Sequence, residues 1–248
     1  MSLMGIIGGS GLSRYPELVV SDVVVLDTPY GKPSAAITIG KLGESEVAFL
    51  PRHGDNHAIA PHKINYRANI HALSQLGVTD IIAVAAVGGI TTDFGPGALA
   101  VPDQLIDYTY GREQSFYSDD FSVDKHIDFT WPYTESLRQN ILHAATTSQL
   151  KVIAGATYGA VQGPRLETAA EIRRMARDGC DIVGMTGMPE AYLARELELN
   201  YATLAVVANW AAGIAEGELT MQQISETLAD GIDNVRMLIA GVIALHQS

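Results

Sequence analysis

The sequence has one cysteine, Cys180, so no disulfide can form within the chain. This usage is typical of a reducing compartment, and we expect a cytoplasmic protein. Long apolar runs are missing too, since the longest, residues 81–90, is about half of the ~20 residues that a membrane span requires. The first residues lack the positive flank and apolar centre of a secretory signal. We therefore expect no membrane partner.

Basic residues are scarce: 16 lysines and arginines stand against 28 aspartates and glutamates, a net charge of −12. Phosphate backbones attract basic surfaces, so this balance argues against general nucleic-acid binding. It does not exclude a small anion held in a local basic pocket. Chains of this length bury roughly 70–75% of their unfolded surface, so a core needs neither metal nor disulfide. The length fits one large domain or two small ones, and we expect one domain over residues 1–248.

Apolar β-branched runs alternate with helical patterns, which predicts an α/β protein. Consecutive apolar residues are typical of strands covered on both faces, and the close succession of the early strands predicts an antiparallel part. We expect strands over residues 4–7, 19–26, 35–39, 46–50, 81–86, 98–106, 152–158, 181–185 and 201–208. We expect helices over residues 64–76, 168–179, 189–198 and 220 to about 242.

Two of these helices begin with the spacing of a capping box, Thr168 with Glu171 and Thr220 with Gln223. No internal repeat, low-complexity tract or linker interrupts the pattern. Residues 108–132 form the one long irregular segment. Loops of this length in compact domains are usually functional or disordered.

A glycine-rich turn follows the first expected strand. Its glycines let backbone N–H groups approach an anion closely, and the hydroxyl of Ser10 adds a donor. The G-x-G-x-x-G fingerprint of dinucleotide sites is not matched, and no Gly-Lys-Ser/Thr follows as in a P-loop. A tight turn that merely needs glycine explains the stretch equally well.

Arg52 and His53 follow the strand expected over residues 46–50. The planar fork of arginine donors suits phosphate, and an adjacent histidine can donate another hydrogen bond. A net-acidic chain with these residues at a strand end builds local positive potential. Together with His57 and His62 they also permit a metal site, although no carboxylate or cysteine pattern accompanies them. An ordinary surface ion-pair cluster is a further alternative.

Three other strand ends carry candidate ligand contacts. The small side chains of Ala85 and Ala86 leave room for a flat ligand, or for a close backbone crossing. Thr186 stands before an expected helix, where anions and hydroxyls bind. Met185 beside it fits simple core packing equally well. Asn209 could read the edge of a heterocycle, although such a residue alone is more often part of a turn.

Together, these stretches resemble the methylthioadenosine phosphorylase branch of the purine nucleoside phosphorylase family, over nearly the whole chain. The motifs that carry the resemblance are Gly-Ile-Ile-Gly-Gly-Ser-Gly (5–11), Asp-Thr-Pro-Tyr-Gly-Lys-Pro (27–33), Arg-His-Gly (52–54), Asn-Tyr-Arg-Ala-Asn (65–69), Gln-Ser-Phe-Tyr (114–117), Gly-Pro-Arg (163–165) and Met-Thr (185–186). The resemblance implies an α/β fold around a mixed, partly closed sheet surrounded by helices. It also implies phosphorolysis of a purine nucleoside with inorganic phosphate as co-substrate, no cofactor and no metal. The implied assembly is a homotrimer, or a hexamer of paired trimers.

The resemblance further implies roles for single residues. Catalytic roles are expected for Asn209 and His53. Phosphate contacts are expected from Ser10, Arg52, His53, Ala85 and Thr186. Nucleoside contacts are expected from Ala86, Gly88, Leu166, Met185, Asn209, Trp210 and Ala211. The pocket for the 5′ substituent is expected from His57, Met221 and His126, the last from the same or a neighbouring subunit. Two positions depart from the family, because Ala85 lacks a threonine hydroxyl and Leu166 lacks a stacking ring.

Asn209 decides the expected substrate. Adenine-specific members carry Asp-x-Asp where this chain has Asn-Trp-Ala at 209–211. A carboxylate accepts from the exocyclic amine of adenine, whereas an amide can donate to the six-position oxygen of hypoxanthine and accept from a protonated N7. We therefore expect S-methyl-5′-thioinosine to be cleaved to hypoxanthine and 5-methylthioribose 1-phosphate.

Other functions stay open. A 5′-hydroxyl bound by His57 or His126 would favour inosine and guanosine over a methylthio nucleoside, and methylthioadenosine is a further alternative substrate. The departures at Ala85 and Leu166 allow a nucleoside-binding protein without turnover. A dinucleotide-dependent oxidoreductase would need a fingerprint that the first glycines do not complete.

Overall fold

The computed structural model describes residues 3–12, 14–215 and 221–245. Its strands are β1 (Leu3–Gly8), β2 (Val19–Val24), β3 (Ile37–Leu42), β4 (Ser45–Pro51), β5 (Val78–Gly89), β6 (Leu99–Val101), β7 (Gln104–Asp107), β8 (Val152–Ala154), β9 (Thr157–Ala160), β10 (Ile182–Gly184) and β11 (Asn200–Trp210). Its helices are α1 (Tyr66–Gln75), α2 (Glu135–Thr147), α3 (Ala169–Asp178), α4 (Gly187–Glu196) and α5 (Met221–Leu245), with short 3-10 turns η1 (Pro61–Lys63) and η2 (Val123–Lys125). Within the described residues, no helix is long and apolar enough to cross a membrane.

These strands form one mixed, eleven-stranded sheet that branches at β5. One path runs β2-β3-β4-β1-β5-β10-β9-β7, and the other leaves β5 through β11 to β6 and β8. β1 and β11 run parallel to β5, whereas β10 runs antiparallel to it. β2, β3 and β4 are antiparallel neighbours, which confirms the expected antiparallel part. Within the described residues, the outermost strands β2, β7 and β8 each pair with a single neighbour, so the sheet is not a closed barrel.

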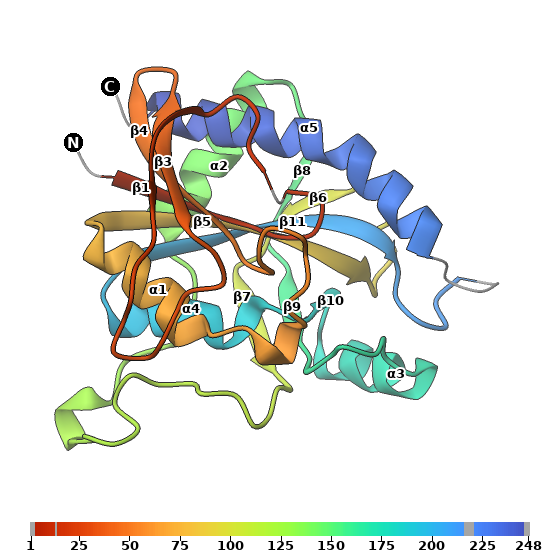
Figure 1. Cartoon of the computed structure of the whole chain (residues 1–248). Coiled ribbons are helices and arrows are strands. Elements are labelled where there is room, and N and C mark those ends of the chain that lie inside the picture. The colour runs from red at the N-terminus through yellow and green to blue at the C-terminus, as the bar shows by residue number, and fades with distance from the viewer. Residues whose placement is uncertain (1–2, 13, 216–220, 246–248) are drawn as a thin grey trace.

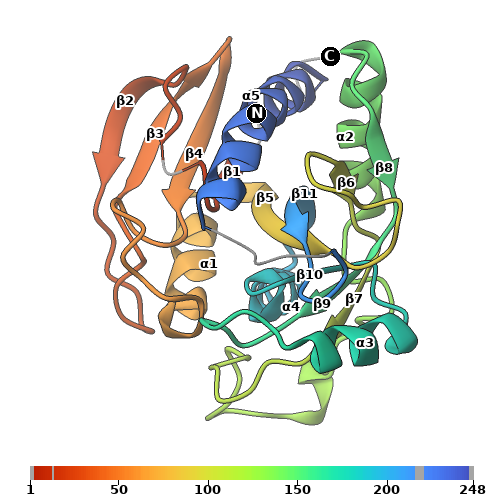
Figure 2. The same cartoon turned by 90° about the vertical axis from the view of Figure 1, so that its right-hand side faces the viewer.

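Helices cover both faces of this sheet (Figure 1). α2 and α5 pack over one face, where Leu137, Val235 and Ile239 are buried against the strands. α1 and α4 cover the other face through buried residues such as Ile70 and Leu193. Figure 2, a quarter turn away, shows the same two layers on either side of β5 and β11. The expected α/β fold with a sheet surrounded by helices is confirmed.

Two of the expected strands are each divided in two. The strand expected over residues 98–106 is interrupted at Pro102 and forms β6 and β7. The strand expected over residues 152–158 is interrupted at Gly155, whose φ is +89°, and forms β8 and β9. β6 pairs with β8 and β11, whereas β7 pairs with β9. The chain therefore changes branches of the sheet at each interruption, which local patterning does not reveal.

The expected helices are present as α1, α3, α4 and α5, and the capping box of α3 is confirmed. Thr168 accepts a hydrogen bond from the backbone N–H of Glu171, whose carboxylate accepts from the N–H of Thr168. Helix α2 is a feature that we did not predict. Leu137, Ile141 and Ala144 are buried at helical spacing, so its signal was present in the sequence.

Helix α5 lies unusually close to its neighbours because of two glycines. A Cβ at Gly231 would lie 2.8 Å from Cγ1 of Val206 in β11, and one at Gly241 would lie 2.9 Å from Cβ of Ala144 in α2. Glycine costs about 1 kcal/mol relative to alanine inside a helix. Here it permits close packing of the helix on the sheet and on α2. Thr220 of the second expected capping box lies outside the described residues.

Residues 108–132 are irregular apart from η2, as expected. After β7 the segment runs away from the sheet and forms the projecting yellow-green loop at the bottom of Figures 1 and 2. It is anchored at Glu196 of α4, whose carboxylate accepts from the hydroxyl of Ser115 at 2.6 Å and from the backbone N–H of Phe116 at 2.8 Å. These two hydrogen bonds therefore fix this part of the segment to α4.

Candidate active site

A cavity of about 290 Å³ opens where several strands end. β1, β4, β5 and β11 are linked by parallel pairing, so their carboxyl ends meet at one edge of the sheet. The start of α4 and the loop before α3 complete the wall. Open α/β sheets bind ligands at this edge because loops and helix N-termini converge there.

The cavity brings together most of the residues expected at the site. The expected phosphate contacts that line it are Ser10, Arg52, His53, Ala85 and Thr186. The expected nucleoside contacts that line it are Ala86, Gly88, Leu166, Met185 and Asn209, and His57 lines it from the expected pocket for the 5′ substituent. These residues come from segments spread over most of the chain, so the fold, and not local sequence, creates their proximity.

Among the described side chains, the cavity is not lined by Trp210, Ala211 or His126, and the side chain of Met221 lies outside the described residues. Neighbours in a strand point to opposite faces, so Trp210 points away from Asn209. Its ring lies 3.2 Å from the position that a Cβ at Gly95 would occupy. Ala211 is buried in an apolar cluster under α3. His126 follows η2 in the projecting segment.

Arg52 is buried and paired with an acid that our sequence reasoning missed. Its Nε and Nη2 each donate to one carboxylate oxygen of Glu190 in α4 at 2.7 Å, and its Nη1 donates to the carbonyl of Val84 at 2.7 Å. The hydroxyl of Tyr201 donates to the same carboxylate at 2.8 Å. Burial alone would lower the pKa of Arg52, but Glu190 raises it above its ordinary value. Arg52 is therefore a fixed cation.

This pairing limits what Arg52 can offer an anion. A guanidinium has five N–H donors. Three of them are used by Glu190 and Val84, which leaves one N–H on each terminal nitrogen. The carboxylate also neutralises the charge of the guanidinium. An anion in the cavity is consequently held by directed hydrogen bonds more than by net positive charge.

Gly9 allows the end of β1 to approach Arg52. A Cβ at this position would lie 2.4 Å from the carbonyl oxygen of Val84 and 3.0 Å from Nη1 of Arg52. This close approach alone explains why position 9 is a glycine, and a bound ligand is not needed to explain it. The next residue, Ser10, lines the cavity, and its Oγ lies 3.5 Å from Nε2 of His57.

His53 is neutral and has a fixed orientation. Its Nδ1 lies 2.8 Å from the carbonyl oxygen of Ile59, so Nδ1 carries the proton and donates it. Burial, with a smaller effect of Arg52, lowers the pKa of His53 to about 4. Its ring packs against that of His57 with centroids 4.2 Å apart. The free Nε2 is therefore an acceptor, which suits an oxygen of phosphate that carries a proton.

The lowered pKa of His53 makes stability depend on pH. An unperturbed histidine has a pKa of 6.5, so the unfolded chain takes up a proton on His53 near that pH, whereas the folded chain does so only near pH 4. The free energy of unfolding therefore falls as pH decreases through this window, by about 1.5 kcal/mol between pH 6.5 and about pH 5. We expect this part of the loss to vanish in His53→Asn, as measured by urea unfolding at both pH values. Equal losses in the wild type and the variant would contradict a buried neutral imidazole.

Thr186 stands at the N-cap of α4, where backbone N–H groups without a helical partner are available to an anion. Its own N–H faces the buried hydroxyl of Tyr158 at 3.4 Å. The chain passes very close to this ring, because a Cβ at Gly184 would lie 2.2 Å from the Tyr158 hydroxyl. Tyr158 therefore supports the turn that carries Thr186 into the cavity.

Asn209 is positioned by an irregularity near the end of β11. The register with β5 shifts between Val207 and Asn209, so that Asn209 pairs with Gly88. The absent side chain at Gly88 leaves space for the amide, since a Cβ there would lie 3.3 Å from Nδ2 of Asn209. Nδ2 donates to the carbonyl of Trp210 at 2.7 Å. One N–H and the Oδ1 acceptor stay available to a ligand.

Glu167 is a cavity residue to which we assigned no role from the sequence. It lines the cavity together with Leu166 and Asn209. Burial raises the pKa of its carboxyl group above the ordinary value. Its position directly before the capping residue Thr168 was a usable signal, because the capping box fixes this end of the loop on α3. Buried carboxylates in cavities are candidates for ligand contact.

A metal site on the cavity histidines is not formed. Among the described residues, no group of three or more histidine, cysteine, aspartate or glutamate side chains converges to hold a metal ion. His53 also uses Nδ1 on Ile59 and stacks on His57 rather than sharing a ligand with it. The cavity therefore presents amide, hydroxyl, imidazole and guanidinium groups together with the carboxylate of Glu167.

Known proteins are similar to this chain in sequence. The sequence profile of the phosphorylase superfamily matches residues 4–244. The chain is 53% identical over 222 residues to a probable S-methyl-5′-thioinosine phosphorylase of Xanthomonas campestris, covering 89% of each protein. It is 44% identical over 250 residues to the 6-oxopurine nucleoside phosphorylase of Pyrococcus furiosus, covering 99% of this chain and 93% of that one.

A solved structure agrees with these relatives. The methylthioadenosine phosphorylase of Schistosoma mansoni in complex with adenine superposes with a TM-score of 0.94 at 31% identity, covering 100% of this chain and 92% of that one. The match extends over the branched sheet and its helices, and so over the strand ends that build the cavity. The motifs, the fold and the relatives together show that this chain belongs to the phosphorylase superfamily, as its resemblance to purine nucleoside phosphorylases indicated.

Proposed function

We propose that this chain is a pentosyltransferase that cleaves S-methyl-5′-thioinosine with inorganic phosphate, giving hypoxanthine and 5-methylthioribose 1-phosphate, without a cofactor. The observation that carries the proposal is the presence of Asn209 and Glu167 in the same cavity as Arg52, His53 and Thr186. The first pair suits the edge of a 6-oxopurine. The other three suit an oxyanion. A nucleoside placed between them has its base at the pair Asn209 and Glu167 and its anomeric carbon near the three residues that suit an oxyanion.

The base end matches hypoxanthine in its pattern of donors and acceptors. Hypoxanthine presents an acceptor at O6 and a donor at N1, whereas adenine presents a donor at N6 and an acceptor at N1. The free N–H of Asn209 donates to O6, and its Oδ1 accepts from protonated N7. The carboxylate of Glu167 accepts from N1–H, and this hydrogen bond opposes the effect of burial on its pKa. Adenine would place its N6 donor against the N–H of Asn209 and its N1 acceptor against the carboxylate of Glu167.

The phosphate end holds the nucleophile. Arg52 offers two N–H donors, Thr186 and Ser10 offer hydroxyls, and Nε2 of His53 accepts the proton of the phosphate. A phosphate oxygen attacks the anomeric carbon as the bond from this carbon to N9 breaks, so positive charge develops on the ribose. The electron pair of that bond leaves with the purine, whose N7 faces Asn209 and takes a proton from water. Donors aligned in advance with developing charge are usually the largest catalytic contribution.

The 5′ substituent is proposed to be methylthio. The relative from Xanthomonas campestris, at 53% identity, is named for methylthioinosine, and the more distant Pyrococcus furiosus enzyme, at 44%, is named for 6-oxopurine nucleosides in general. Both names agree with the 6-oxopurine that is proposed for the base end of the cavity. His57 lines the cavity and can bind a 5′-hydroxyl, so inosine is the second candidate substrate.

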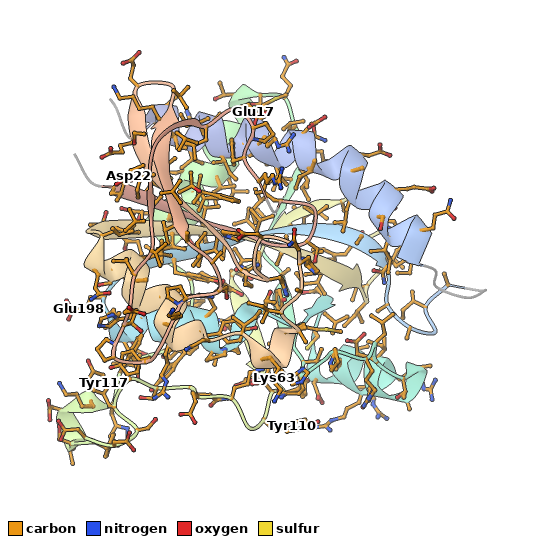
Figure 3. The ribbon with its side chains drawn as sticks, viewed as in Figure 1. Glu17, Asp22, Lys63, Tyr110, Tyr117 and Glu198 are labelled. Carbon is orange, nitrogen blue, oxygen red and sulfur yellow. The ribbon has the colours of Figure 1, made fainter. Side chains whose placement is uncertain are left out.

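We also propose that each chain is one domain over residues 1–248, located in the cytoplasm, and that three chains form a trimer. The support for the trimer is the projecting segment, in which Tyr110, Phe121, Val123 and Trp131 are 71%, 58%, 81% and 64% exposed. Figure 3 shows Tyr110 and Tyr117 at the lower margin of the molecule. Exposed aromatic side chains in one segment are typical of an interface. A monomeric mass in solution would contradict this assembly.

The proposal is tested by following hypoxanthine release from S-methyl-5′-thioinosine with and without phosphate. We expect release only with phosphate, and 5-methylthioribose 1-phosphate as the second product. Phosphate-independent release would identify a hydrolase. Binding of the nucleoside without any release would identify a binding protein. Inosine measured in parallel decides the preference at the 5′ position.

A further inference from the structure

Arg112 lies in the projecting segment and contacts two other segments of the chain. Its Nε donates to Oε1 of Gln162 at 3.1 Å, and its Nη2 donates to the carbonyls of Val161 and Gln162 at 3.1 and 2.8 Å. Its Nη1 faces the carbonyls of Met185 and Met188 at 2.9 and 2.5 Å. A further contact joins Nη1 to the hydroxyl of Tyr66 at 3.2 Å, and this ring lies under the guanidinium. One side chain thus binds two separate loops.

These two loops carry opposite ends of the cavity. Val161 and Gln162 lead into the loop that bears Leu166 and Glu167, at the proposed base end. Met185 and Met188 flank Thr186, at the proposed phosphate end. The loops also touch each other directly. Gly163 has a φ of +61°, and a Cβ there would lie 2.4 Å from the sulfur of Met185.

All acceptors of Arg112 are neutral. Among the described residues, no carboxylate forms a salt bridge with it. A structural arginine on a protein surface usually pairs with an acid, as Arg67 does with Glu113 at 3.2 Å in the same region. Arg112 instead donates mainly to backbone carbonyls, with the side chains of Gln162 and Tyr66 as its other partners. Only a planar group with five donors can reach acceptors on both loops at once.

We propose that Arg112 is a positioning residue, which fixes the distance between the base-binding loop at 162–167 and the sugar- and phosphate-binding turn at 185–188. This inference rests on the proposed function, because it assigns the loops to the two substrates. Arg112 does not line the cavity. Its effect on the reaction passes through the carbonyls that it holds. Misplacement of a reacting group by about 1 Å can cost ~10²-fold in rate.

The test compares Arg112→Ala with Arg138→Ala. Arg138 is buried, whereas Arg112 is half-buried, and Arg138 donates to the backbone carbonyls of Pro102 at 2.8 Å and Val101 at 3.3 Å. It also pairs with Glu135, but it lies in α2 and does not line the cavity. Thermal unfolding measures how much stability each variant loses. Steady-state kinetics with varied methylthioinosine and varied phosphate measure kcat and both KM values. Guanidinium chloride at low, non-denaturing concentration is then added to both variants.

We expect Arg112→Ala to lose ~10²-fold in kcat/KM, with raised KM for both the nucleoside and phosphate. We expect added guanidinium to restore part of this loss, because it can occupy the vacated position. Arg138→Ala is expected to retain wild-type kinetics at a similar loss of stability. The inference is overturned if Arg112→Ala keeps its kinetics, or if its loss ignores guanidinium and follows melting temperature alike in both variants. An inactive wild-type protein would instead refute the proposed function.

Discussion

Replacement of Asn209 by aspartate is expected to lower kcat/KM for S-methyl-5′-thioinosine by ~10²–10³-fold. The variant has nearly the same size and shape but loses the N–H that donates to O6 of the base. The new carboxylate also places negative charge beside an oxygen that becomes more negative as the base departs. A charged acceptor opposed to an acceptor in a buried site leaves both without a partner. The effect is therefore expected in kcat as well as in KM, and steady-state kinetics separate the two.

The matched control for this variant is Asn140→Asp in α2. It adds the same charge to the chain, away from the residues that line the cavity. We expect its kinetics to equal those of the wild type. Asn209→Asp is not expected to gain full activity on methylthioadenosine, because Ala211 supplies no second carboxylate and Glu167 still opposes N1 of adenine. Unchanged turnover of methylthioinosine by Asn209→Asp would remove Asn209 from its proposed role.

Replacement of Glu190 by alanine is expected to destabilise the protein by about 3–5 kcal/mol. Arg52 and Glu190 are 1% and 0% exposed, and they are joined by two hydrogen bonds of 2.7 Å. Removal of the carboxylate leaves a buried guanidinium without its counter-charge and the hydroxyl of Tyr201 without its acceptor. Breaking such a pair costs far more than the pair itself contributes, since the remaining charge stays away from water. The expected fall in Tm is roughly 10 °C.

Glu113→Ala is the matched control for Glu190→Ala. Glu113 pairs with Arg67 at 3.2 Å, but its side chain is 70% exposed. Exposed pairs of this kind contribute about 0–1 kcal/mol, so we expect little change in Tm. Differential scanning calorimetry of both variants makes the comparison. A similarly small fall in Tm in both variants would contradict the account, because it would show that buried Arg52 does not need Glu190 as its counter-charge.

The sequence predicted those features of the site that local patterns carry. Arg52, His53 and Thr186 each follow a strand, and Asn209 lies near the end of β11. The strand ends of the mixed sheet bring these positions to one cavity. The capping box at Thr168 was visible for the same reason, because both of its partners belong to one helical turn.

Features that depend on distant parts of the chain were not predicted. Glu190 is 138 positions from Arg52 in the sequence, and nothing in either segment indicates the other. Arg112 was hidden in a segment without regular structure, since its acceptors lie on two loops some 50 to 76 positions away. Trp210 was expected in the cavity from the family resemblance. Alternation along β11 instead sends it to the opposite face.

The most direct test of the account is the ratio of kcat/KM for S-methyl-5′-thioinosine to that for S-methyl-5′-thioadenosine at saturating phosphate. The two nucleosides differ only at the purine edge that faces Asn209 and Glu167. A site built on hydrogen bonds to one edge rejects the other by ~10⁴-fold or more, and we expect a ratio of this order. A ratio near one, or a preference for the amino-purine, would contradict the central claim that an amide and a carboxylate in this cavity recognise a 6-oxopurine.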